Sequence, residues 1–223
     1  MSTESITITD NRTGKTYELP IDSGTYSEYG AYVRSAELRQ IKVSDTDFGL
    51  LGYDPAYFNT ASCASAVTFI DGEKGILRYR GFPIDQLAEQ STFLEVAYLL
   101  LYGELPTRDQ LSAWSDDVNA QAVVDADILK FIDGYRVGSH TMGMLVGVLG
   151  GLSAFYDDVR DFETDDARDR HIRRLIGNIA TLGAAVHRRS EGLPYVASDP
   201  GLGYCGNLLN MLFGKEGQVY KTD

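Results

Sequence analysis

Two long stretches decide the fold: HTMGMLVGVLGGLSAFY at residues 140–156 and DARDRHIRRLIGNIATLGAAVHRRS at residues 166–190. In the first, apolar side chains and glycines recur at steps of three and four, the spacing of one face of an α-helix. The second carries an apolar stripe at the same spacing, made of Ile172, Leu175, Ile176, Ile179, Leu182, Gly183 and Val186. Both stretches are therefore predicted to be long helices.

Glycine is frequent in the first stretch, at Gly143, Gly147, Gly150 and Gly151. A glycine inside a helix costs up to about 1 kcal/mol relative to alanine, so this frequency needs a physical reason. Because glycine has no side chain, we expect tight packing of one helix on another along this stripe. The acidic run 157–169 between the two stretches is expected to be a solvated connection, whose acids suit the next helix's N-terminus.

Shorter helices are predicted before and after this pair. Thr92 begins one helix, with Glu95 at the spacing of a capping box, and Gly103 ends it. Thr107 begins another. Further helices are predicted at 83–87, 125–132 and 204–213.

β-Hairpins are predicted in the N-terminal part. Residues 5–20 alternate apolar and polar side chains on both sides of a turn that contains Gly14, and residues 66–80 place two strand-forming runs around a glycine-bounded turn. Residues 21–50 show weak periodicity and are expected to be mostly irregular. The predicted fold class is mainly α with small N-terminal β-hairpin elements.

Composition and charge exclude several classes of protein. The chain has 223 residues and a formal net charge of −12, and 43% of its residues are hydrophobic, which suits one or two globular domains. Its basic residues cluster only as the short pairs 173–174 and 188–189, so no nucleic-acid partner is expected. No apolar run approaches the roughly 18 residues of a membrane span, and no targeting pattern begins the chain. We therefore expect no membrane association and a cytoplasmic location.

Residues that could carry chemistry are scarce. The chain has three histidines, His140, His171 and His187, and two cysteines, Cys63 and Cys205. His140 is expected to be a helix-capping or core residue, His171 to face solvent, and His187 to lie at a helix end, where the dipole favours it. The cysteines are expected to be buried core thiols.

Motifs for known chemistries are also missing from the sequence. It contains no metal-ligand spacing, phosphate-binding loop, dinucleotide fingerprint or serine-hydrolase elbow. Adjacent acids, such as Asp116–Asp117 and Asp157–Asp158, do not converge on one substrate from a helix and are expected to be solvated. The residues alone therefore predict a helical scaffold with no catalytic set and no metal site.

A resemblance to a known family begins at residues 59–87, which read NTASCASAVTFIDGEKGILRYRGFPIDQL. This string resembles the N-terminal half of bacterial citrate synthase. The resemblance continues at FLEVAYLLLYGELPT (93–107) and at 139–143, 190–195, 206–207 and 209–213. The hairpin at 5–20 is similar to the extra β element of the long bacterial subclass.

The resemblance implies an acyltransferase of the tricarboxylic acid cycle, which condenses acetyl-coenzyme A with oxaloacetate to give citrate and free coenzyme A. Residues 1–50 would form the hairpin and an irregular segment, and 51–223 part of the large helical domain, with the small domain absent. The family's catalytic aspartate and histidines lie in stretches that match nothing within 1–223. No catalytic, cofactor-binding or metal-binding residue is therefore assigned, no cofactor is expected, and the site for the substrate acetyl-coenzyme A is largely missing. We expect the 223-residue chain to be inactive alone.

Long bacterial members of the family often bind NADH at an allosteric site in this half. Tyr156 and Arg174 match positions of that site and would be its remnant here. Residues 120–123, AQAV, stand where the family has an Arg-His-Thr-Met-like segment, while Asn178 replaces a lysine and Gly217 a possible cysteine. Because the lost cationic groups would hold the dinucleotide's phosphates, regulation by NADH is expected to be weak or absent.

Alternatives to this assignment stay open. The chain could be a non-catalytic interaction or dimerisation module derived from a citrate synthase, or half of a 2-methylcitrate synthase, which uses propionyl-coenzyme A. The helices at 140–156 and 166–190 resemble those by which family subunits pair, so a homo-oligomer is expected. Whether it is a dimer or a hexamer is left open by the sequence.

Overall fold

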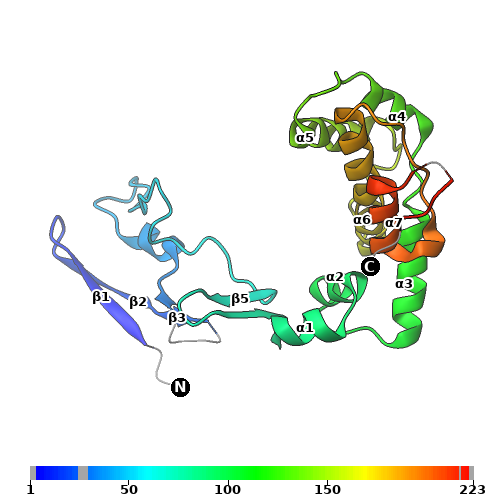
Figure 1. The fold of residues 1–223 in the computed structure, drawn as a ribbon. Helices are drawn as coiled ribbons and strands as arrows, with labels where there is room; N and C mark the ends of the chain where they lie inside the picture. The colour runs from blue at the N-terminus through cyan, green and yellow to red at the C-terminus, as the bar shows by residue number, and fades with distance from the viewer. Residues whose placement is uncertain (1–3, 25–29, 216, 221–223) are drawn as a thin grey trace. The chain divides into compact units, whose positions relative to one another are not determined.

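The computed structural model describes residues 4–24, 30–215 and 217–220, and its elements are shown in chain order in Figure 1. Two compact units make up the chain, Met1–Ala66 and Val67–Asp223. These units follow from contacts between residues, and the family-based division at residue 50 stays a prediction.

The first unit contains the predicted hairpin, in strands β1 (Ser5–Asp10) and β2 (Lys15–Pro20). They pair antiparallel from Ser5 with Pro20 to Asp10 with Lys15, and Gly14 takes the left-handed conformation in the turn, with φ of 73°. The Asp10 carboxylate accepts the Arg12 backbone N–H at 3.0 Å and pairs with its guanidinium. The hairpin prediction is therefore confirmed.

The remainder of the first unit has little regular structure. Strands β3 (Asp22–Ser23) and β4 (Ala31–Tyr32) pair over two residues each, and a 3-10 helix spans Ser35–Gln40. Fully buried side chains are few, Leu19 and Ile41 among them. The mostly irregular character predicted for 21–50 is confirmed for the described residues of that range.

The second unit begins with a three-stranded antiparallel sheet. Strands β5 (Thr68–Asp71) and β6 (Ile76–Tyr79) form the predicted hairpin. A third strand, β7 (Phe82–Pro83), was not predicted, because two residues are too few to show a strand pattern in the sequence. After β6, the Arg80 guanidinium donates to the Leu100 carbonyl at 2.7 and 3.2 Å. This contact ties the sheet to the helix that contains Leu100.

Seven α-helices follow within the described residues, and the mainly α fold class is confirmed. Their bounds are α1 Ile84–Gln90, α2 Phe93–Tyr102, α3 Arg108–Ala120, α4 Ala126–Asp133, α5 Thr141–Gly151, α6 Asp165–Ser190 and α7 Gly203–Phe213. Thr92 and Thr107 form complete capping boxes, and Gly103 ends α2 with φ of 91°. Helix α5 is shorter than predicted, because a 3-10 turn (Leu152–Ala154) replaces its last residues.

Helix α6 is the centre of the second unit, since it contacts α3, α4, α5 and α7 (Figure 1). The largest core cluster joins α6 to α4 and α5 and includes Ile128, Ile132, Met144, Val148, Leu182 and Val186. A single apolar stripe for α6 was therefore only partly right. Small residues such as Ala180 and Ala184 are buried, because neighbouring helices cover α6 on several sides. Leu175 of the predicted stripe is nevertheless 51% exposed.

The glycines of α5 make room for aromatic rings. A Cβ at Gly147 would meet the Tyr135 hydroxyl at 2.1 Å, and one at Gly151 would meet the Phe131 ring at 3.1 Å, whereas one at Gly143 would meet open space. Helix-on-helix packing along this stripe is therefore confirmed only in part, since Gly151 meets Phe131 of α4, whereas Gly147 meets Tyr135, which follows that helix. The rings fill the space that the missing side chains leave.

Candidate functional site

Two adjacent arginines of α6 bind the ends of other helices. Arg188 is 6% exposed, and its Nη1 donates to the carbonyls of Leu212 at 2.9 Å and Gly214 at 3.2 Å, at the C-terminal end of α7. Arg189 donates to the carbonyls of Asp133 at 2.8 Å and Tyr135 at 2.9 Å, at the end of α4. Cations suit the exposed carbonyls of a helix C-terminus. This basic pair therefore joins three helices.

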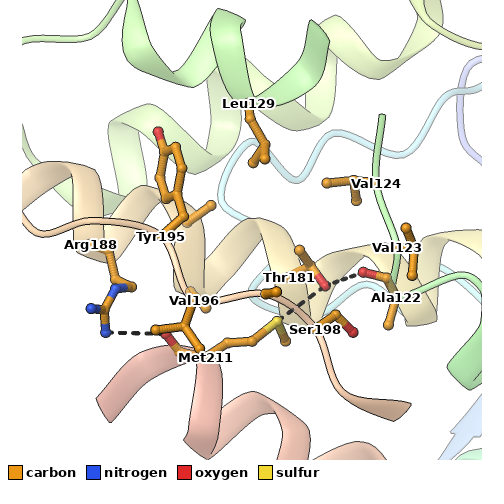
Figure 2. A pocket seen from close by; sticks show the side chains of 13 residues that line it. Ala122, Val123, Val124, Leu129, Thr181, Arg188, Tyr195, Val196, Ser198 and Met211 are labelled. Atoms are coloured by element: carbon orange, nitrogen blue, oxygen red, sulfur yellow. Dashed lines mark hydrogen bonds between the residues drawn. The ribbon is translucent and has the colours of Figure 1, made fainter. Parts of the chain in front are cut away.

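A cavity of about 370 Å³ lies between α4, α6, α7 and the segments 122–124 and 195–198 (Figure 2). Its walls are mainly apolar and include Ala122, Val123, Val124, Leu129, Ala184, Ala185, Val196, Ala197 and Met211. The Thr181 hydroxyl donates to the Ala122 carbonyl at 2.5 Å and so joins α6 to the segment that precedes α4. A volume and lining of this kind are typical of a small-ligand pocket.

A second cavity, of about 640 Å³, shares Arg188 and the segment 195–198 with the first. Asn207 holds this segment's C-terminal end, since it donates to the Ser198 hydroxyl at 2.9 Å and accepts the Asp199 backbone N–H at 2.8 Å. At the other end, the Tyr195 hydroxyl donates to Asp133 at 2.7 Å. Burial, followed by this carboxylate, raises the pKa of Tyr195. The segment is thus anchored at both ends.

The structure brings the two predicted nucleotide-site residues together. The Arg174 guanidinium lies 4.4 Å from the centre of the Tyr156 ring. The same guanidinium donates two hydrogen bonds to Asp158, at 2.7 and 3.0 Å, and Asn178 donates to the Tyr156 hydroxyl at 2.7 Å. The hydrogen bond from Arg174 holds the pKa of Asp158 well below its usual range. Both residues therefore have partners within the chain.

Of the other predicted positions of that site, Asn178 belongs to this cluster, and the cavity-lining positions lie apart from it. Ala122 and Val123 line the first cavity and Gly217 the second, whereas Tyr156 and Arg174 line neither. The carboxylate beside Arg174 was missed, because Asp158 was assigned to a solvated run. That expectation was partly wrong, since Asp158, Asp161, Asp165 and Asp169 of the run form ion pairs with α6 arginines.

Arg173 anchors α3 to α6. It pairs with Asp117 of α3 and with Asp169 on its own helix, and Asp169 also accepts the Tyr102 hydroxyl. Trp114 Nε1 donates to the same Tyr102 oxygen at 3.1 Å. Burial and the Asp169 carboxylate raise the pKa of Tyr102 to about 12. Every member has a structural partner, so this cluster joins α2, α3 and α6.

Histidines and cysteines take places that only partly match the predictions. Cys63 and Cys205 are exposed, which corrects the expectation of core thiols; Cys63 lies outside regular structure, and Cys205 in the first turn of α7. His140 precedes α5 but is exposed and forms no side-chain cap. His171 is partly exposed, and its Nε2 lies 2.9 Å from the Asp161 carbonyl. His187 is in the last turn of α6, as predicted.

The described residues contain neither a cluster of metal ligands nor a membrane-spanning helix. Within the described ranges, no group of three or more His, Cys, Asp or Glu side chains is arranged to hold a metal ion. No helix among the described residues combines the length and apolar character that crossing a bilayer requires.

Comparison with known proteins identifies the family. A family model described as citrate synthase, C-terminal domain, matches residues 56–222. The chain is 39% identical over 214 residues to citrate synthase of Dictyostelium discoideum, a match that covers 93% of this chain and 40% of the relative. It is 40% identical over 171 residues to citrate synthase 1 of Mycobacterium tuberculosis, which covers 77% of this chain and 40% of that protein. The chain belongs to the citrate synthase family.

Solved structures agree with this assignment. Citrate synthase from Pyrobaculum aerophilum matches with a TM-score of 0.66 and 29% identity, over 73% of this chain and 42% of that one. The Thermoplasma acidophilum enzyme, solved as a ternary complex with carboxymethyl coenzyme A and oxaloacetate, matches with a TM-score of 0.65 and 25% identity, over 70% and 41%. The chain therefore spans about two fifths of the length of the relatives it matches.

Proposed function

We propose that this chain supplies the N-terminal portion of a citrate synthase of the tricarboxylic acid cycle. The enzyme would form citrate and free coenzyme A from acetyl-coenzyme A, oxaloacetate and water. The observation that carries this proposal is the family match over residues 56–222, together with relatives named citrate synthase.

The catalytic groups would come from the part of the family fold that this chain does not match. Condensation of a thioester with a ketone needs acid–base groups of tuned pKa, and a dicarboxylate substrate needs arginines. Here the paired arginines 173–174 and 188–189 bind partners within the chain. We assign no catalytic residue and no cofactor to residues 1–223, and we infer that this chain alone is inactive.

A second copy of the chain is the proposed partner of α5 and α6. On α5, Met142 and Val146 lie one helical turn apart and are 57% and 66% exposed, and Leu175 of α6 is 51% exposed. Apolar side chains at this exposure favour contact with another protein surface. We propose that homo-oligomers form through these helices, in the cytoplasm, although one relative is named peroxisomal and another glyoxysomal.

The alternatives differ in what the isolated chain would do. A dimerisation module adapted to stand alone would form a discrete dimer that unfolds cooperatively. A portion of a larger enzyme would leave other apolar side chains uncovered, such as Tyr53 and Phe58, which are 91% and 93% exposed. Half of a 2-methylcitrate synthase would behave in the same way, and only the complete enzyme's use of propionyl-coenzyme A would distinguish it.

Size-exclusion chromatography with light scattering tests these alternatives. We expect the 223-residue chain to elute over a broad range of masses above the monomer, because uncovered apolar surface associates without a fixed partner. Val146→Glu should narrow this range by removing association through α5, while Leu193→Glu, outside both helices, is the matched control. A single dimer that melts in one cooperative transition would contradict the assignment as a portion of a larger enzyme and favour the dimerisation module, and it would still agree with pairing through α5 and α6.

Regulation by NADH is proposed to be weak or absent. Arg174 is held by Asp158, and Asn178 supplies no charge, so neither side chain is free to bind a phosphate. Titration of NADH into the chain should give no saturable signal in the micromolar range. Saturable micromolar binding would contradict this inference.

A further inference from the structure

The walls of the first cavity are mainly aliphatic. Leu129 of α4, Ala185 of α6 and Met211 of α7 line it, together with alanines and valines of the segments 122–124 and 195–198 (Figure 2). Apolar surface gains free energy when it leaves water, so these walls favour a hydrocarbon group over a polar one. The first cavity is therefore a candidate site for an apolar molecule.

This cavity is large enough for a small molecule and is partly open to solvent. An apolar cavity of about 150 Å³ inside a protein holds one benzene molecule, which has six carbon atoms. At about 370 Å³, the first cavity has room by the same proportion for roughly 15 non-hydrogen atoms. Val123 belongs to its lining and is 68% exposed, so a ligand can enter beside the segment 122–124.

The polar side chains that are described in this lining have partners within the chain. The Thr181 hydroxyl donates to a main-chain carbonyl at 2.5 Å, and the Tyr195 hydroxyl donates to a carboxylate at 2.7 Å. The Ser198 hydroxyl oxygen accepts a hydrogen bond from Asn207 at 2.9 Å. A ligand rich in polar atoms would lose hydration here and regain few hydrogen bonds. The lining therefore favours a ligand with few polar atoms.

A net charge on the ligand is disfavoured as well. Among the described residues that line the first cavity, Arg188 alone is charged, and its guanidinium donates to four main-chain carbonyls. Its positive charge repels a cation, and because the carbonyl oxygens already solvate it, an anion would gain little from it. The chain's net charge of −12 also repels anions. A neutral ligand avoids each of these costs.

We propose that the first cavity binds a compact, neutral, aliphatic molecule of roughly 10 to 15 non-hydrogen atoms. The molecule displaces water from the space between α4, α6 and α7 and makes van der Waals contacts with their aliphatic side chains. Binding is non-covalent. It does not rest on the proposed synthase function, because every residue that forms the site lies within this chain.

Isothermal titration calorimetry on the 223-residue chain tests the proposal with three probes that share the adamantane cage and differ in charge. At pH 7 adamantanol is neutral, adamantane carboxylate is an anion and aminoadamantane is a cation. We expect one saturable site for adamantanol, with a dissociation constant of about 1 mM or below, and affinities weaker by about tenfold or more for both ions. No saturable binding of adamantanol, or equal affinity for either ion, would overturn the proposal.

Substitutions that fill the cavity locate the site. Ala185→Leu adds three carbons to the α6 wall and should weaken adamantanol binding by about tenfold or more, because close-packed interiors have no room for both. Leu129→Trp fills the space from α4 and should act in the same way. Ala154→Leu, outside the cavity, is the matched control and should bind adamantanol as wild type does.

Circular dichroism checks that each variant folds. Unchanged binding by a folded Ala185→Leu or Leu129→Trp variant would place adamantanol on apolar surface elsewhere and would overturn the assignment. If neither variant folds, the comparison of the three probes on the wild-type chain decides.

Discussion

Single residues decide whether the cluster around Arg174 binds a nucleotide or only holds two segments of this chain together. We call the contacts of Arg174 with Tyr156 and Asp158 the clasp. Tyr156 and Arg174 lie together, but the Arg174 guanidinium already donates two hydrogen bonds to the Asp158 carboxylate. The Asn178 side-chain amide donates a hydrogen bond to the Tyr156 hydroxyl oxygen. The cluster therefore attaches the segment before α6 to the helix itself.

Asp158→Asn tests this clasp through its pH dependence. Arg174 holds the pKa of Asp158 below its usual range, so the ion pair stabilises the fold fully above the unfolded carboxyl's pKa, about 3.9. That stabilisation is lost as pH falls through the lower, folded value. Asp158 is 34% exposed, so we expect a loss of up to about 1 kcal/mol in the free energy of unfolding at pH 7.

Urea titrations of both proteins between pH 7 and pH 2 measure this effect. The difference between wild type and Asp158→Asn should shrink as the pH falls below about 4. Asp157→Asn, next to it but exposed and without an ion pair among the described residues, is the control and should match wild type. A difference that is constant with pH would show that the clasp is not electrostatic.

Local sequence signals predicted residue roles where the partner lies close in the chain. Thr92 with Glu95 and Thr107 with Gln110 form their capping boxes, because both partners lie within one turn. Arg188 could not be assigned from the sequence, since its acceptors at 211–214 come from a helix that only the tertiary fold brings near. For the same reason the first cavity, which is built from five separate segments, was not predictable.

Among the elements, α6 carries most of the packing, and its contact with α3 depends on one glycine. A Cβ at Gly177 would lie 2.4 Å from the Val118 carbonyl oxygen and 2.6 Å from Gln121 Cβ. The helices approach closely there because Gly177 has no side chain. The sequence pointed to the glycines of α5 for this role, since their number was conspicuous, whereas only contact between two helices identifies Gly177.

Gly177→Ala tests this crossing. We expect the free energy of unfolding to fall by about 1–3 kcal/mol, because the methyl group meets main chain that cannot yield without moving α3. Gly183→Ala on the same helix is the matched control, since its Cβ would meet open space. There the change should be neutral or raise stability by up to about 1 kcal/mol, as replacing a helical glycine does. Equal changes in the free energy of unfolding for the two variants, measured by urea titration, would show that α3 and α6 do not cross closely at Gly177.

At the scale of the whole molecule, exposed area supports a portion of a larger fold. The chain exposes 15406 Å². Two separate compact proteins of 66 and 157 residues would together expose about 12,000 Å². The excess is comparable to the surface that obligate interfaces bury. Periodicity predicted the helices, but it could not show how much of their surface another part of the fold would cover.

Coenzyme A thiol release by the purified 223-residue chain tests the central claim most directly. The chain is supplied with acetyl-coenzyme A, with and without oxaloacetate, and free thiol is followed with a thiol-reactive dye while circular dichroism confirms the helices. Because no catalytic residue is assigned within 1–223, we predict no oxaloacetate-dependent release above the blank. Release that requires oxaloacetate and saturates with its concentration would contradict the account.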